Sequence, residues 1–204
     1  MNLESAVELA LQRTGPFIAM FGKSALRDWT LTGTRHWLRA ALKPAAARDA
    51  FIAAAVAEIE RDAAEFATLI GPCRRLVSIG VGSGIAEAHL CRVLGVESVL
   101  LVDTEEGGKG HGYAASGAGY ASLEAARRRV EAVGVTVQTW NPDREPAPAF
   151  EFDALVSILA MGFHFPDSAY NGFVKRNAAP GAVLAYDYRE SAGTPARRVV
   201  RRIG

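Results

Sequence analysis

Apolar residues in the first 70 positions recur at steps of three and four, the spacing of one face of an α-helix. The clearest stripe consists of Ile52, Val56, Ile59, Ala63, Phe66 and Ile70. Charged residues fall mostly on the other faces of the same helical wheel, which predicts a long helix packed on a core. Gly71 and Pro72 then end this helix, because proline cannot continue one. Residues 1–70 are therefore predicted to form an N-terminal helical segment.

The pattern changes at residue 75, where short apolar runs begin to alternate with helical stretches, as in a parallel β-sheet. The predicted strands cover residues 76–79, 99–102, 135–139, 152–159 and part of 179–187, and the predicted helices cover 85–94, 122–134 and 167–177. Three prolines make the stretch 141–149 irregular rather than helical. Thr194 and Pro195 form a helix-start signal, so the basic tail to Arg202 is predicted to begin a last helix.

These elements predict an α/β fold, a Rossmann-like, doubly wound and mostly parallel sheet of about five strands. Residues 71–204 are expected to form one compact cofactor-binding domain behind the helical segment. Aromatic residues between Phe17 and Trp29, and around His36 and Trp37, either fill the helical core or cover a pocket.

A glycine-rich turn is the strongest chemical signal in the chain. It lies in the stretch Leu76-Val-Ser-Ile-Gly80-Val-Gly82-Ser-Gly84, and the next predicted strand ends in Asp103. A dinucleotide site calls for a small residue where Ile85 stands, whereas here the third glycine comes one residue earlier. A nicotinamide-dependent oxidoreductase is therefore the second functional hypothesis. A tight strand-to-helix turn without any ligand is the purely structural alternative.

The Gly-x-Gly-x-Gly turn followed by an acidic strand end resembles motifs I and II of class I S-adenosylmethionine-dependent methyltransferases. The resemblance implies that Gly80, Gly82 and Gly84 wrap the amino-acid end of S-adenosylmethionine. It further implies that Asp103 accepts the ribose hydroxyl protons, with Thr104 beside it in the site. Asn141 either reads the adenine amino group with its amide oxygen or opens a proline turn, and backbone at Leu159 borders the cofactor.

The stretch Ser157-Ile-Leu-Ala-Met-Gly-Phe-His-Phe-Pro-Asp-Ser-Ala-Tyr170 is similar to one found in bacterial sugar O-methyltransferases. The chain departs from that pattern at Ala160, where a serine is expected, and at Met161, where a tryptophan is expected.

Within this stretch His164 is the candidate catalytic residue, a general base, because imidazole titrates near neutral pH. The alternative is a histidine that only hydrogen-bonds the loop backbone. Phe163 and Tyr170 are candidate substrate-binding residues, with burial in the core as the alternative.

Composition narrows the class of partner. Lys and Arg together number 23 against 22 acidic residues, so the overall charge gives no attraction toward nucleic acid or membrane. Cys73 and Cys91 lack metal-ligand spacing and are expected to stay reduced. His111 suits a metal no better, so no metal site is predicted. No apolar run approaches a membrane span, and acidic residues interrupt the amphipathic N-terminus, which favours a cytoplasmic protein over a secreted one.

The leading hypothesis is thus a methyltransferase that uses S-adenosyl-L-methionine to methylate a hydroxyl of a small molecule, such as a sugar or glycosylated metabolite. Only 17 residues follow Asp187, so the antiparallel strand pair that ends the usual methyltransferase sheet is expected to be missing. An open sheet edge would need a cover, such as the N-terminal helices or a second subunit in a homodimer. A non-catalytic, S-adenosylmethionine-binding member of the fold is the remaining alternative.

Overall fold

The computed structural model describes residues 1–24, 26, 34–105, 122–163, 166–190 and 194–204. These residues divide into two compact units, residues 1–61 and residues 62–105 with 122–204. Helix α5 (Ala45–Ile70) begins in the first unit and ends in the second. The domain division at residue 70 stays a prediction.

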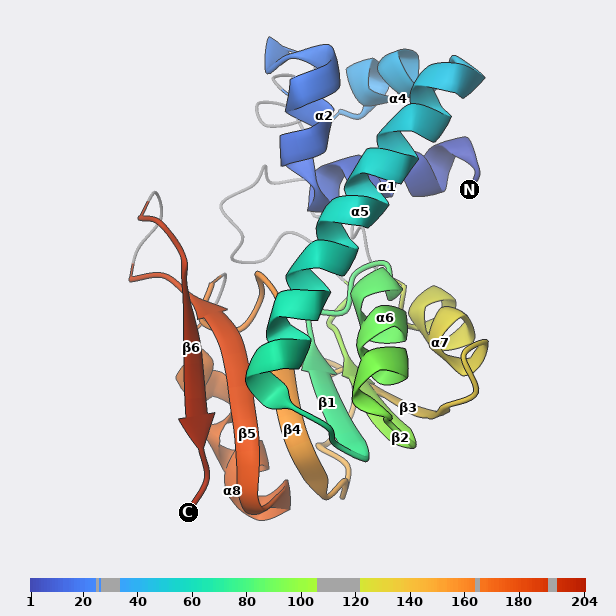
Figure 1. Cartoon of the computed structure of the whole chain (residues 1–204). Coiled ribbons are helices and arrows are strands. Elements are labelled where there is room, and N and C mark those ends of the chain that lie inside the picture. Colours follow the sequence, from blue (N-terminus) through green and yellow to red (C-terminus); the bar gives the residue numbers. More distant parts are fainter. Residues whose placement is uncertain (25, 27–33, 106–121, 164–165, 191–193) are drawn as a thin grey trace. The chain divides into compact units, whose positions relative to one another are not determined.

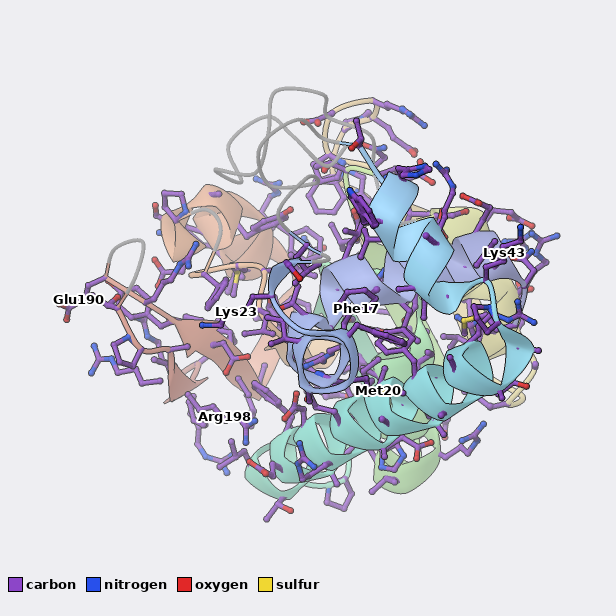
Figure 2. All side chains as sticks on the ribbon, turned by 90° about the horizontal axis from the view of Figure 1, so that it is seen from above. Phe17, Met20, Lys23, Lys43, Glu190 and Arg198 are labelled. Atoms are coloured by element: carbon purple, nitrogen blue, oxygen red, sulfur yellow. The ribbon has the colours of Figure 1, made fainter. Side chains whose placement is uncertain are left out.

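The first unit consists of helices α1 (Leu3–Gln12), α2 (Thr14–Phe21), α4 (His36–Leu42) and the first part of α5. Asn2 caps α1, because its side-chain oxygen accepts a hydrogen bond from the Ser5 amide at 2.9 Å. Phe17 is fully buried among these helices and meets the ring of Phe51 edge-on at 5.8 Å (Figure 2). Trp37, by contrast, is 54% exposed. Of the predicted aromatic core, Phe17 is therefore a clear member.

Helix α5 ends at Ile70, as predicted, because Gly71 adopts a left-handed conformation and Pro72 follows. Its predicted apolar stripe is buried from Ile59 to Ile70. In its first turns the buried positions are Phe51 and Ala55, one residue before the predicted ones. Among the described residues, no helix is long and apolar enough to cross a membrane.

The second unit is built on a six-stranded sheet in the order β3-β2-β1-β4-β5-β6. Its strands are β1 (Arg75–Ile79), β2 (Ser98–Val102), β3 (Thr136–Trp140), β4 (Phe152–Ser157), β5 (Ala178–Tyr188) and β6 (Arg197–Arg202). The first five run parallel, and β6 pairs antiparallel with β5. The chain moves from β1 outward to β3 and then returns to β4 on the other side of β1. The carboxyl ends of β1 and β4 therefore flank the switch point at which α/β sheets bind ligands.

Helices lie on both faces of this sheet, α6 (Ile85–Leu94) on one and α8 (Asn171–Asn177) on the other, as Figure 1 shows. Helix α7 (Leu123–Glu131) packs beside α6, and a short 3-10 helix, η1 (Asp167–Tyr170), precedes α8. The end of α6 is set by Gly95, whose positive φ of 73° suits glycine. Both faces of the central strands are apolar, which is typical of a parallel sheet covered twice. The Rossmann-like fold is thus confirmed, including α6 over residues 85–94 and the irregular stretch 141–149.

Two expectations for the C-terminus are wrong. The sheet has six strands rather than five, and the tail forms strand β6 instead of a helix. An antiparallel pair, β5 with β6, therefore exists where none was expected. The physical reason is the long edge of β5, whose backbone groups need partners, together with Val199, which packs against the core. These long-range gains outweigh the local helix-start signal of Thr194 and Pro195.

Candidate functional site at the carboxyl ends of the strands

The glycine turn joins β1 to α6 in a conformation that only glycine adopts easily. Gly80, Gly82 and Gly84 have φ values of 80°, 49° and 73°. A Cβ on Gly80 would lie 2.1 Å from the Cβ of Ala160, and one on Gly84 would lie 2.7 Å from the Cα of Ala126. Gly80 thus lets the loop after β4 approach the turn, while Gly84 lets α7 pack on α6. The turn and these two neighbours form one closely packed unit.

Asp103 follows β2 and is tied directly to this turn. Its Oδ2 accepts a hydrogen bond from the Gly82 amide at 3.2 Å, and its Oδ1 accepts one from the Glu105 amide at 2.9 Å. A carboxylate has about four acceptor sites. The half-buried Asp103 carboxylate is therefore fixed in place beside the turn, and it is the kind of acceptor that ligand hydroxyl groups require.

Asn141 is almost completely buried, with 2% of its surface exposed. Its Nδ2 donates to the Thr104 carbonyl at 3.0 Å, and its Oδ1 accepts from the Asp143 amide at 3.0 Å. The side chain thus links the ends of β2 and β3 and forms the turn around Pro142. The structural alternative for Asn141 describes this geometry, and its contact with an adenine stays a prediction.

The loop after β4 holds a non-glycine residue in the left-handed region. Leu159 has φ 57°, a conformation that costs a leucine free energy. Its amide donates to Asp187 Oδ2 at 3.1 Å, which stabilises that conformation. The fully buried Ser157 supports the same loop, since its hydroxyl donates to the Ile79 carbonyl at 2.9 Å and accepts from the Met161 amide at 2.8 Å.

Asp187, at the end of β5, is in turn held by Arg198 of β6. The Arg198 Nε lies 3.7 Å from Asp187 Oδ1, and the same guanidinium pairs with Asp62 at 3.5 Å and with Glu65. Figure 2 shows Arg198 near the C-terminal part of α5, which carries these two acids. A chain of charged contacts therefore runs from α5 through β6 to the Leu159 backbone.

A second buried carboxylate, Glu87, lies beneath the glycine turn. It is 3% exposed, and its Oε1 accepts a hydrogen bond from the Ser78 hydroxyl at 2.8 Å. Arg129 of α7 donates to the Ser83 carbonyl within the turn. Burial lowers the pKa of Arg129, and the charge of Glu87 opposes that shift. Arg129 therefore supports the turn directly, and Glu87 ties the first turn of α6 to β1.

The two predicted substrate-binding residues, Tyr170 and Phe163, lie in different environments. Tyr170 is 8% exposed and meets Trp140 edge-on at 5.9 Å, in the core of the unit. Burial, followed by the charges of Asp103 and Asp143, raises the pKa of Tyr170 well above its ordinary value. Phe163 is half-buried and carries the guanidinium of Arg189 at 3.9 Å from its ring centre. A substrate contact of either residue stays a prediction.

His164 and His111 lie outside the described residues. Within the described part of the chain, no group of three or more His, Cys, Asp or Glu side chains could hold a metal ion. Cys73 and Cys91 are free and buried, and burial raises the pKa values of their thiols to about 11 and about 12.

The glycine turn, Asp103, Thr104, Asn141 and Leu159 were predicted from the sequence as parts of one site, and the structure places them at one edge of the sheet. Asp187, Arg198 and Glu87 were not predicted. Asp187 had a signal, because it closes a buried strand just as Asp103 does. Arg198 had none, since its tail was predicted to be helical.

No protein-family model and no curated protein sequence matches the chain. Among solved structures, a SAM-dependent methyltransferase from Thiobacillus denitrificans with bound S-adenosyl-L-homocysteine is 18% identical, over 66% of this chain and 51% of its own, with TM-score 0.44. The O-methyltransferase TomG from Streptomyces achromogenes is 21% identical, over 63% and 54%, with TM-score 0.39. CalS10, an amino pentose methyltransferase from Micromonospora echinaspora, is 19% identical, over 66% and 51%, with TM-score 0.42. The chain spans about half the length of these proteins.

Proposed function

We propose that this chain is an S-adenosylmethionine-dependent methyltransferase that acts on a hydroxyl group of a small molecule. The observation that carries the proposal is the junction of Asp103 with the glycine turn. The carboxylate accepts from the Gly82 amide, which holds it beside the turn, and a carboxylate there suits the hydroxyls of a ribose, which are hydrogen-bond donors. The start of α6 points free amides and a positive dipole end toward the same place.

The residues present fit such a cofactor. Gly82 carries no side chain, so a ligand can approach the backbone of the turn closely there, while Gly80 and Gly84 are packed against Ala160 and Ala126. The loop at Leu159 and Ala160 flanks the turn from β4, because Ala160 lies against Gly80. When bound, the cofactor supplies a methyl group on a sulfonium ion, which leaves as a neutral thioether.

The chain's own part in the reaction is to position the acceptor and to take its proton. The acceptor oxygen forms a bond to the methyl carbon as the carbon–sulfur bond breaks, and the hydroxyl proton is lost. His164 is the proposed base, five residues after Leu159 in the sequence. A neutral imidazole accepts this proton above an ordinary pKa of about 6.5. Phe163 and Tyr170 are proposed to line the acceptor side.

Calorimetric titration with S-adenosyl-L-homocysteine tests the cofactor assignment. Wild-type protein should bind it, and Asp103→Ala should weaken binding by about 3 kcal/mol, the loss of two hydrogen bonds to a charged group. Glu151→Ala is the matched control, because Glu151 is an exposed acid at the other end of β4. NAD should not bind. No binding by the wild-type protein, or equal binding by Asp103→Ala, contradicts the proposal.

The base is tested separately with an acceptor found by screening sugars for release of S-adenosyl-L-homocysteine. His164→Gln should lower kcat by about 100-fold and remove its rise between pH 6 and 7, as expected for loss of a general base. The affinity for S-adenosyl-L-homocysteine should stay unchanged. An unchanged pH profile would instead favour a histidine that only supports the loop.

A further inference from the structure

Two arginines at the carboxyl end of β5 and the start of β6 lie on aromatic rings. The Arg189 guanidinium is 3.9 Å from the ring centre of Phe163, and that of Arg197 is 5.4 Å from the ring centre of Tyr188. Tyr188 and Arg197 are direct partners across the two strands. Among the described residues, no carboxylate forms an ion pair with either arginine.

The carboxylates nearest in sequence are engaged elsewhere or exposed. Asp187 pairs with Arg198. Glu190 is exposed and extends outward from the sheet in Figure 2. The positive charges of Arg189 and Arg197 thus remain available at this edge, and Arg189 is half-buried, so solvent screens it less than a surface charge.

Arg189 is also held in a fixed position. Its Nε donates to the Phe163 carbonyl at 2.6 Å, and its backbone amide donates to the Gly162 carbonyl at 3.0 Å. These contacts leave the terminal nitrogens of the guanidinium to form the two-pronged donor that suits a carboxylate or phosphate. A side chain that is already ordered loses less entropy when it binds a ligand.

This arginine belongs to the same edge as the candidate cofactor site. The Phe163 amide donates to the Ala160 carbonyl at 3.0 Å, and Ala160 lies against Gly80 of the glycine turn. One short turn of backbone therefore connects the glycine turn to the residues that hold Arg189. A ligand group bound by Arg189 would lie on the β4–β5 side of the cofactor turn.

We propose that Arg189, assisted by Arg197, binds an anionic group of the methyl acceptor, so that the acceptor is an acidic small molecule. This inference rests on the proposed function, because it names the substrate class of the same site. The anion is a carboxylate or a phosphate, since the guanidinium recognises the shared geometry of both. Neutral analogues that lack the anion should bind much more weakly.

The test is calorimetric titration of the protein, saturated with S-adenosyl-L-homocysteine, with glucose, glucuronate and glucose 6-phosphate. At least one of the two acids should bind at least tenfold more tightly than glucose, and the stronger of them identifies carboxylate or phosphate. Arg189→Gln should weaken that binding at least tenfold. Arg202→Gln should change it less than twofold, because Arg202 is an exposed arginine at the far end of β6.

Two further measurements keep the outcomes distinct. Arg189→Lys keeps the charge but not the planar fork, and it should give an intermediate affinity for the acid. Thermal melting and unchanged affinity for S-adenosyl-L-homocysteine should show that both Arg189 variants are folded. Equal binding of glucose and both acids, or equal binding by Arg189→Gln, overturns the inference. If S-adenosyl-L-homocysteine itself does not bind, the proposed function fails, while the same acid titrations on the free protein still decide the role of Arg189.

Discussion

The two halves of the sheet's carboxyl edge are held together by different kinds of force. On the β1–β3 side, the glycine turn fits because Gly80 and Gly84 have no side chain, and the Asp103 and Asn141 side chains are held by hydrogen bonds with backbone groups. On the β4–β6 side, the Leu159 loop is held by a charged contact from Asp187 to Arg198 and on to the acids of α5. Adding a methyl group at a turn glycine should therefore destabilise the first half. Removing the charge of Asp187 should destabilise the second half.

The largest loss of stability is expected from the substitution Gly80→Ala. The new methyl would overlap the Cβ of Ala160 at 2.1 Å, and alanine must also adopt φ 80°. We expect a loss of about 3 kcal/mol in the free energy of unfolding, measured by urea denaturation.

Gly181→Ala is the matched control for Gly80→Ala. Gly181 has the same φ of 80°, and nothing lies within 4 Å of its added Cβ. It should cost only the backbone term, about 1 kcal/mol. The double variant Gly80→Ala with Ala160→Gly should recover most of the difference. Equal losses for Gly80→Ala and Gly181→Ala would show that close packing does not hold this half.

The next effect is expected from Asp187→Ala, which removes the acceptor of the Leu159 amide and the partner of Arg198. Leaving a buried donor and a charged group with fewer partners should cost about 2 kcal/mol in stability. Affinity for S-adenosyl-L-homocysteine should fall as well, because the Leu159 loop loses its support.

Asp187→Asn separates the two contributions. It keeps an acceptor for Leu159 but loses the charge, so about half of the stability loss should remain. If Asp187→Ala is as stable as the wild-type protein, a charged contact does not hold the β4–β6 half of the edge.

The smallest effect concerns the opposite, amino-terminal edge of the sheet, where Asp153 of β4 joins the two halves by accepting hydrogen bonds from Arg75 of β1 and from Arg74, the residue before it. The distances from Asp153 Oδ2 to the two amides are 3.2 and 2.9 Å, and the Arg75 guanidinium lies 2.6 Å from Oδ1. The hydrogen bond from the Arg75 side chain is the main cause that lowers the pKa of Asp153.

A lowered folded-state pKa means that this contribution is complete above the ordinary aspartate value of about 3.9 and is lost as the pH falls below it. Urea denaturation at pH 7 and at pH values from 4 to 2 should therefore show an acid-dependent loss of about 1 kcal/mol from this group. Asp153→Asn should remove that part of the pH dependence. Identical acid profiles of variant and wild-type protein would exclude a role for this contact between the halves.

The two halves also differ in how far the sequence predicted them. The glycine turn, Asp103 and helix α6 were predicted because their determinants are local, since glycine is required by backbone conformation at the residue itself. Strand β6 was not predicted. It forms because the edge of β5 needs a partner strand, and the local helix-start signal at Thr194 gives no information about that edge. The Asp187–Arg198 contact depends on that strand and could not be predicted without it.

The site shows the same division between local and long-range causes. The position of Asn141 was predicted, but not that its amide would join Thr104 to the turn at Asp143, because that contact spans two loops. Glu87 had no signal in the sequence, since a glutamate in the first turn of a helix is ordinarily exposed. The role of Glu87 follows from its burial beside Ser78, which the sequence alone does not show.

The left-handed conformation of Leu159 has a consequence for protein engineering. Replacing it with glycine would relieve about 1 kcal/mol of backbone strain, but glycine also gives the unfolded chain a comparable gain in entropy. A screen for thermal stability would therefore see little change at this position. A glycine at this position would also make the loop more flexible, so variants selected for stability alone can lose the site's geometry without a change in their melting temperature.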